Sequence, residues 1–247
     1  MAELLIFIVV GFIAQIINGS LGMSYGTLTV AMLLTMGLPP VIASTSVHIS
    51  KAVTGYTSGL SHWKLGNVEK PLTLKLIASG ITGGIVGAII LTWLPEGILN
   101  PMIAVYLLVT GITICIRSFY KSQIKEKIYP VMTLGVIGGF VDAVGGGGWG
   151  PIVTSTLLSR GYNVRRTIGS VSFAEAFVAT AVTVVLLFNI SLVSMNWDVV
   201  IGLMIGGIIA SPLAALLCNK LPVKQLTFAV GSLVVLLSTI MLWSALL

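Results

Sequence analysis

The chain has 247 residues, of which 56% are hydrophobic and only 8% are charged. Soluble domains carry about 25% charged residues, so this chain lacks the polar surface that keeps a fold of its size dispersed in water. The composition excludes an ordinary soluble domain and predicts a protein whose solvent is lipid. The net charge of +6 lies in short loops between apolar runs, where basic residues set membrane orientation, so we expect no binding to nucleic acid.

Continuous apolar runs predict that the chain crosses the membrane as helices. In lipid every backbone N–H and C=O group needs an internal partner, which leaves helices and closed barrels. The runs have the ~20 residues of a spanning helix and not the short alternation of barrel strands. In chain order the first half has apolar segments at 4–18, 24–37, 40–61, 70–93 and 97–117. The second half has them at 130–144, 149–159, 166–189, 197–218 and 223–246.

The first two segments of each half are short, and a glycine-rich break separates them. At about 1.5 Å rise per residue such segments are marginal for a full crossing. Each pair is therefore either a re-entrant hairpin or two short crossing helices, and in both cases it enters and leaves on one side. The other three segments of each half are long enough to span. The N-terminal segment carries Glu3 and lacks the basic start of a signal peptide, so we expect it to be retained.

The two halves are related in sequence. A shift of 124 residues aligns 11–52 with 135–176 without a gap. The identities concentrate at glycines, which is stronger evidence for a duplication than shared hydrophobicity. The aligned glycines are Gly11 and Gly135, Gly22 and Gly146, Gly26 and Gly150, and Gly37 and Gly161.

The duplication predicts one membrane domain, 1–247, with repeat one at 1–120, repeat two at 125–247 and a polar link at 117–128. The basic residues of the link place it in the cytoplasm, and alternation along the chain then puts both termini outside. The other basic residues expected inside are Lys64, Lys70, Arg160, Arg165, Arg166, Lys220 and Lys224. The halves thus have inverted topology. The predicted fold is an all-α polytopic protein of the cytoplasmic membrane built from inverted-topology repeats, an architecture of secondary transporters.

The two breaks, 18–26 and 142–150, are the first candidate for a binding site. Glycine is unfavourable in a helix unless the backbone turns or is closely approached, and free N–H groups at membrane depth are tolerated only where they line a cavity. Amides at broken helix ends favour anions, so we expect both breaks to form one substrate site. Close helix packing by small residues is the alternative. The candidate substrate-binding residues are Asn18, Gly19, Ser20, Gly22, Gly145, Gly146, Gly147 and Gly148.

Ionisable residues inside apolar segments are the second candidate. Asp142 is the repeat partner of Asn18. It is either a proton carrier or cation ligand within the membrane, or a cap for the helix after the break. Lys51 and Glu175 are also repeat partners, each about ten residues into a long helix, and pseudo-symmetry brings them face to face near the midplane. They form either a structural ion pair, or a counter-charge for the substrate anion at Lys51 with a proton-linked gate at Glu175.

Polar and aromatic side chains complete the candidates. His48 lies three residues before Lys51, on the same helix face, and His62 is expected at the membrane interface. Tyr25 and Trp149, repeat partners directly after the breaks, either gate the site or serve packing or the aromatic belt. Three hydroxyl groups either bind an oxyanion or join helices: Ser46, Ser170 and Ser172. No metal-ligand spacing or nucleotide-binding motif occurs in the sequence, so we expect no metal and no cofactor.

The duplicated pattern resembles the TauE/SafE family of sulfite-exporter-like permeases. It consists of a glycine-rich break, a short apolar helix, a turn at Gly37 or Gly161, and a small-residue helix containing Ser46 or Ser170. The resemblance covers nearly the whole chain. The second break fits the family pattern Gly-x-Gly-Gly-Gly with a following proline, Pro151, whereas the first break has no proline.

The resemblance implies a secondary transporter, not an enzyme, that moves a small sulfur-containing anion such as sulfite, sulfoacetate or another organosulfonate. Export is the expected direction, and proton coupling through Glu175 or Asp142 stays open. An anion channel with the same path is the alternative. A membrane enzyme or assembly factor is less favoured, because the sequence has no evident nucleophile–base pair. The expected partners are the small anion and the lipid bilayer, and a homo-oligomer stays open.

Overall fold

The computed structural model describes residues 2–119, 130–189, 195–218, 220–221 and 223–246. Within these residues the fold is all-helical, as predicted, with ten α-helices and one π-helical turn. The first half contains α1 (Ala2–Leu21), α2 (Tyr25–Thr35), α3 (Pro40–Lys64), α4 (Lys70–Trp93) and α5 (Glu96–Phe119). The second contains α6 (Val131–Gly145), η1 (Gly150–Thr154), α7 (Ser155–Ser159), α8 (Val164–Leu187), α9 (Trp197–Leu217) and α10 (Val223–Leu246). Most of the predicted link, at 120–129, lies outside the described residues.

Local sequence signals account for several helix starts. Pro40 occupies the first position of α3, where its missing N–H costs nothing and its fixed φ suits the helix. The side chain of Asn163 caps α8 by accepting a hydrogen bond from the backbone N–H of Arg166 at 3.1 Å. Asn196 caps α9 in the same way, through the N–H of Val199 at 3.4 Å.

The first helix is longer than predicted, because it does not end at the start of the break. It continues through Gly19 and Ser20 to Leu21, so these residues belong to its last turns. The Ser20 hydroxyl donates to the carbonyl of Ile16 at 2.5 Å, within the helix. A Cβ atom at Gly19 would lie 2.6 Å from that of Ala214 on α9, so close packing explains this glycine. The first break is therefore only 22–24, and the second is 146–149.

Among the residues that the structure describes, six helices are long and apolar enough to cross a membrane by length and composition: α1, α4, α5, α8, α9 and α10. The prediction had placed α3 among the apolar spans in place of α1. At 25 residues α3 is long enough to cross, but serine, threonine, histidine and lysine interrupt its apolar sequence. Most of these side chains, Lys51 and His48 among them, are buried inside the bundle, so the helix does not need an apolar surface all round. The helices α2 and α6 are short, as predicted.

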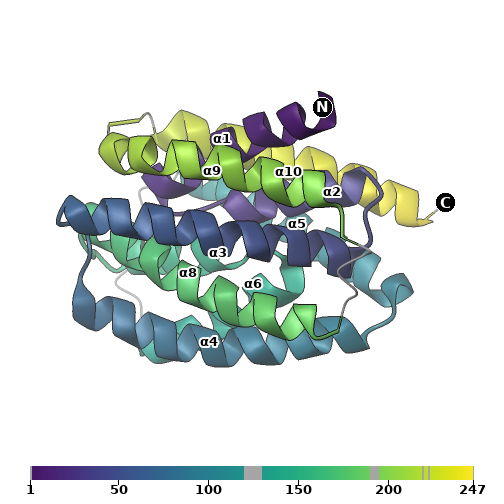
Figure 1. Ribbon diagram of the computed structural model, residues 1–247, viewed down its shortest axis with the longest axis horizontal. Helices are drawn as coiled ribbons and strands as arrows, with labels where there is room; N and C mark the ends of the chain where they lie inside the picture. Colours follow the sequence, from purple (N-terminus) through teal and green to yellow (C-terminus); the bar gives the residue numbers. More distant parts are fainter. Residues whose placement is uncertain (1, 120–129, 190–194, 219, 222, 247) are drawn as a thin grey trace.

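The helices pack as four close pairs, α1 with α9, α4 with α6, α5 with α10, and α3 with α8. In Figure 1, α3 runs between the layer formed by α1, α9 and α10 and the layer formed by α8 and α4. Glycines allow the closest approaches. A Cβ atom at Gly206 of α9 would overlap the Ile8 carbonyl of α1, and one at Gly83 of α4 would overlap the Val136 carbonyl of α6. Small residues at such contacts are typical of helix packing in lipid.

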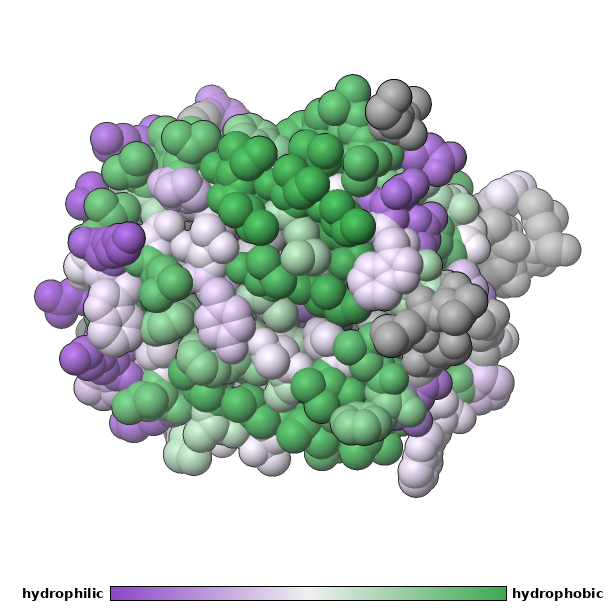
Figure 2. Space-filling model, in the orientation of Figure 1, coloured by the Kyte–Doolittle hydropathy of each residue, from purple (hydrophilic) through white to green (hydrophobic). Residues whose placement is uncertain are grey.

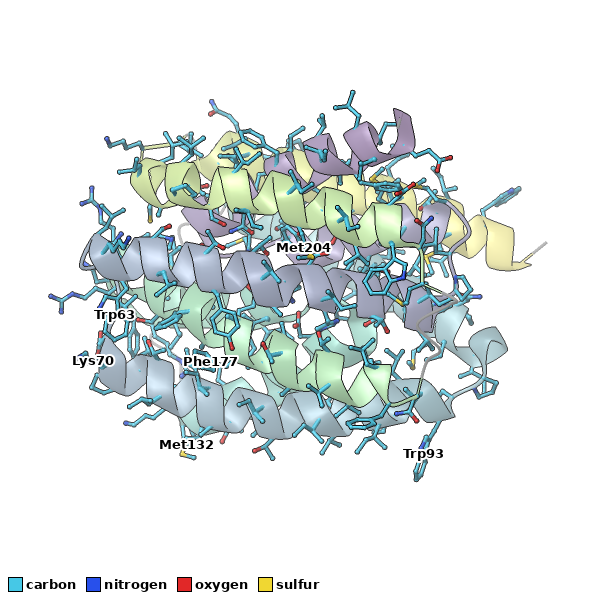
Figure 3. The ribbon with its side chains drawn as sticks, in the orientation of Figure 1. Trp63, Lys70, Trp93, Met132, Phe177 and Met204 are labelled. Atoms are coloured by element: carbon cyan, nitrogen blue, oxygen red, sulfur yellow. The ribbon has the colours of Figure 1, made fainter. Side chains whose placement is uncertain are left out.

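The outer surface is apolar around the bundle and polar toward its ends. Leu74, Val109, Ile209 and Leu236 are each more than half exposed. Figure 2 shows hydrophobic residues over the middle of one face and hydrophilic residues gathered toward both ends. In Figure 3, Lys70 and Trp63 lie at one end, where the ammonium group stacks 5.4 Å from the ring centre, and Trp93 lies at the other. An apolar surface of this extent, together with helices long enough to span, is typical of a protein surrounded by lipid.

Candidate functional site

Three charged side chains meet in the middle of the bundle. Lys51 of α3 places its Nζ atom 2.8 and 2.7 Å from the two carboxylate oxygens of Asp142, in the last turns of α6. The same Nζ atom lies 3.0 Å from Oε1 of Glu175 on α8. All three residues are buried, with at most 6% of their surface exposed. Burying charges away from water is costly unless each has partners, so this cluster is the most unusual electrostatic feature of the described chain.

Asp142 accepts hydrogen bonds from the ammonium group of Lys51 and from two backbone amides. Its Oδ1 atom accepts from the backbone N–H groups of Gly148 and Trp149, at 2.9 and 3.0 Å, in addition to Lys51. The ring of His48 lies beside it, with Nε2 3.4 Å from Oδ2. The His48 Nδ1 atom is 2.8 Å from the carbonyl of Ser44, which can only accept, so the ring carries its proton on Nδ1. Asp142 thus fills the capping role that was one of its two predicted interpretations.

Glu175 has fewer partners. Its Oε1 atom faces Lys51, and its Oε2 atom accepts from the side-chain amide of Asn18 at 3.1 Å. Counting Lys51 as +1 and each carboxylate as −1 gives the cluster a formal charge of −1, with His48 left aside. The predicted meeting of Lys51 and Glu175 is present in the structure, but sequence reasoning missed that Asp142 joins them.

The repeat alignment relates the missed contact to a second one. Asn18 aligns with Asp142, and Lys51 aligns with Glu175. If each residue is replaced by its aligned partner in the other half, the contact between Lys51 and Asp142 becomes a contact between Glu175 and Asn18. Both contacts are observed. Four residues that sequence analysis treated as two separate pairs form one connected network.

The two breaks lie against each other. A Cβ atom at Gly26 would overlap the carbonyl of Gly146, and one at Gly150 would overlap Met23 and Gly22. The hydroxyl of Thr154 donates to the Gly22 carbonyl at 2.6 Å across the same contact. Gly22 and Gly146 have φ angles of 73° and 68°, a conformation that side chains rarely adopt.

Two glycines of the second break have close neighbours of their own. A Cβ atom at Gly147 would overlap the backbone of Thr27, and one at Gly145 would overlap the ring of Tyr106. Close packing thus explains several of these glycines, and it also brings the two sets of helix ends together.

The candidate hydroxyl groups divide into two kinds. The Ser170 side chain accepts a hydrogen bond from the backbone N–H of Glu69 at 2.8 Å, so it holds the start of α4 and does not take part in the charged network. The hydroxyls of Ser46 and Ser172 are buried without a hydrogen-bond partner among the described residues. Unpaired buried hydroxyls are uncommon and indicate a missing partner such as water or a ligand.

The aromatic and histidine candidates are buried. Tyr25 and Trp149 are each 1% exposed, so they do not form an aromatic belt. The Tyr25 hydroxyl points to the Leu203 carbonyl at 3.4 Å, and the Trp149 indole donates to the Val171 carbonyl at 3.1 Å. His62 is also fully buried, with Nε2 2.8 Å from the Gly19 carbonyl, so its side chain faces the bundle interior, and its position at the membrane interface stays a prediction. These polar groups find hydrogen-bond partners inside the bundle, as buried tyrosine and tryptophan side chains usually do.

An apolar cavity of about 190 Å³ lies between α5 and α6, lined by residues that include Met102, Tyr106 and Phe140. The Tyr106 hydroxyl donates to the Gly147 carbonyl at 3.2 Å, which joins the wall of this cavity to the second break. The lining offers almost no polar surface. It therefore does not suit a charged ligand, and the charged network is the better candidate site.

Comparison with known proteins agrees with this architecture. The family pattern described as "Sulfite exporter TauE/SafE" matches residues 7–241. The chain belongs to the TauE/SafE family. It is 40% identical over 246 residues to the "Probable membrane transporter protein YtnM" of Bacillus subtilis (strain 168), which covers 96% of this chain and 82% of that protein. It is 23% identical over 175 residues to the "Probable membrane transporter protein YdhB" of the same organism, covering 67% of this chain and 71% of the relative.

No solved structure matches the chain. Membership of the TauE/SafE family identifies a multi-pass membrane transporter and not an enzyme. The family resemblance seen in the sequence is thereby confirmed.

Proposed function

We propose that this TauE/SafE protein is a secondary transporter that exports a small sulfur-containing oxyanion, such as sulfite, sulfoacetate or another organosulfonate. The observation that carries the proposal is the buried ammonium group of Lys51, held between Asp142 and Glu175 beside two broken helices. A buried cation near the start of a helix suits an anion, and α2 starts directly after the first break. The name of the family supplies the sulfur chemistry.

The proposal includes two repeats of inverted topology that rock about the site. The helix pairs support it, because exchanging the halves converts the pair α1 and α9 into α6 and α4. The same exchange leaves the pairs α3 with α8 and α5 with α10 unchanged. A two-fold axis through the contact of Lys51 and Glu175 accounts for this pattern. Transporters of this architecture bind substrate at the repeat interface and expose it alternately to the two sides.

The charges of the network favour proton coupling through Glu175. An anion cannot approach Lys51 while both carboxylates are ionised, because the cluster then has a formal charge of −1. We assign the proton to Glu175, since it has two partners whereas Asp142 is held by an ammonium group and two amides. Protonation of Glu175 brings the formal charge of the cluster from −1 to 0, and the ammonium group of Lys51 can then contact the substrate. One proton then travels with each monoanion.

This coupling has a measurable consequence. Uncoupled export of a monoanion gains about 2.3 kcal/mol per 100 mV of inside-negative potential, whereas a proton and a monoanion moving together carry no net charge. Sulfite or sulfonate flux should therefore be insensitive to a potassium–valinomycin potential in the native protein. In Glu175→Gln the flux should lose its pH dependence and become voltage-dependent.

The test is flux of labelled sulfite and labelled sulfonates from proteoliposomes. Lys51→Met should lower the flux at least about tenfold, since it removes a charge-assisted contact to the substrate. Lys70→Met, at the exposed start of α4, and Glu69→Gln are matched controls and should transport normally. Flux no higher than in protein-free liposomes, or full flux in Lys51→Met, would overturn the proposal. Saturable exchange with trans-stimulation identifies a carrier, and linear single-channel currents would replace it with an anion channel.

A further inference from the structure

The second break carries an internal anion. The N–H groups of Gly148 and Trp149, which follow the break, both donate to Oδ1 of Asp142. These amides have no carbonyl acceptor in a helix, because they lie at its start. A carboxylate of the protein therefore fills the anion-binding end of this half.

The first break has backbone N–H groups at the aligned positions but no carboxylate, and its Ser24 has a φ of 87°, a left-handed conformation that Gly148 does not share. Ser24 and Tyr25 align with Gly148 and Trp149, and Asn18 stands where the second half has Asp142. The amide of Asn18 turns away to donate to Glu175. No hydrogen-bond acceptor for the N–H groups of Ser24 and Tyr25 exists within the described residues, and no side chain caps α2. The start of this 11-residue helix is thus the unfilled counterpart of the Asp142 site.

A second observation points to a ligand at the same place. Ser172 is 1% exposed, and its hydroxyl has no hydrogen-bond partner among the described residues. It lies on α8 between Ile168 and Glu175, and residues at this spacing share one face of a helix. Ile168 reaches within 3.2 Å of where a Cβ atom of Gly22 would lie, and Glu175 bonds to Asn18. The face that carries Ser172 therefore borders the first break and the end of α1.

We propose that the transported oxyanion binds at the first break, where one of its oxygens accepts from the N–H groups of Ser24 and Tyr25. A second oxygen accepts from the hydroxyl of Ser172. This rests on the proposed function and makes its site asymmetric, because Asp142 already occupies the matching amides of the other half. The ligand class is a small oxyanion with two oxygens on one centre, as in sulfite, a sulfonate or a carboxylate. Halide ions, which lack this geometry, should bind poorly.

The decisive variant is Asn18→Asp, which reproduces the arrangement of the second half in the first. The new carboxylate is repelled by Glu175 and attracted to the free amides of Ser24 and Tyr25, so it competes with the ligand from inside the protein. Binding of sulfite and of methanesulfonate to purified protein, measured by calorimetry, should weaken at least about tenfold, the loss expected for charge-assisted hydrogen bonds. Asn67→Asp is the matched control, because Asn67 is a buried amide whose side chain contacts His62. It should bind both anions as the native protein does.

A second variant keeps the proposal testable if Asn18→Asp does not fold. Ser172→Ala should raise the dissociation constant for sulfite about threefold to tenfold by removing one neutral donor. Ser238→Ala removes a buried hydroxyl that bonds only within α10 and should leave binding unchanged. Native-like sulfite binding by folded Asn18→Asp, or by Ser172→Ala when the first variant fails to fold, would overturn the assignment. If the native protein transports sulfite while these variants do so equally well, the proposed function survives and the first-break site falls.

Discussion

Removing charge from Asp142 and from Glu175 should have very different effects on stability. In Asp142→Asn the new NH2 group must replace Oδ2, where it faces the ammonium group of Lys51 and has only the Nε2 atom of His48, at 3.4 Å, as an acceptor, because Lys51 and the amides of Gly148 and Trp149 can only donate. In Glu175→Gln the new NH2 group can face Asn18, whose own amide turns over to present its oxygen. Each variant leaves Lys51 with one carboxylate, so the formal charge of both clusters is the same. The difference between them comes from hydrogen bonding alone.

The expected magnitudes follow from these contacts. Removing one partner of a buried ion pair lowers the free energy of unfolding by about 3–5 kcal/mol. Asp142→Asn should fall near the low end of this range, because Lys51 still has Glu175 as an ionic partner. For a chain of this size about 3 kcal/mol corresponds to a melting temperature lower by roughly 6–12 °C. Glu175→Gln should change the free energy of unfolding by no more than about 1 kcal/mol.

Thermal unfolding in one detergent, followed by size-exclusion chromatography of heated samples, measures both variants against the native protein. A drop in melting temperature for Glu175→Gln that equals or exceeds the drop for Asp142→Asn would refute the reasoning. That result would mean that Glu175, and not Asp142, makes the contacts on which the stability of the network depends.

Two further predictions concern the breaks and a buried thiol. Gly147→Ala should abolish folding or transport, because its Cβ atom would overlap the backbone of Thr27. Gly37 has a φ of 86° and open space around it, so Gly37→Ala should lower the free energy of unfolding by only about 1 kcal/mol. Equal expression and flux of the two variants would contradict the close contact between the breaks. Cys218 lies just after the end of α9, and burial raises the pKa of its thiol to about 11. Because the thiolate is the reactive form, maleimide labelling of Cys218 should be slow at pH 8, and the labelling rate should increase as the pH approaches that pKa. Fast labelling of Cys218 at pH 8 would show that this helix end is open.

The sequence predicted the fold class and the long helices, because apolar length alone decides which segments can cross lipid. The predicted segment 70–93 coincides with α4. The sequence did not predict where the two breaks begin and end, because Gly19 and Gly145 stay helical when other side chains pack on them. Propensity treats such glycines as helix breakers, but tertiary contact overrides it.

Part of the site could be predicted and part could not. The pairing of Lys51 with Glu175 was predicted from the repeat alignment, in which the two residues are partners. The presence of Asp142 depends on how the end of α6 is set against α3, and no local pattern in the sequence encodes that register. The burial of Tyr25 and His62 likewise depends on carbonyl acceptors, those of Leu203 and Gly19, supplied by distant parts of the chain.

On the proposed function, the differences between the halves matter as much as their similarity. If Asn18 were aspartate, both sets of helix-end amides would hold internal carboxylates and no receptor for an anion would remain. If Asp142 were asparagine, Lys51 would lose its tightest partner, at 2.7 Å, and its charge would be less well fixed. One half therefore anchors the buried cation and the other half leaves its amides to the substrate. The two breaks align in sequence, and the difference between Asp142 and its aligned residue Asn18 gives their helix starts different roles on the proposed function.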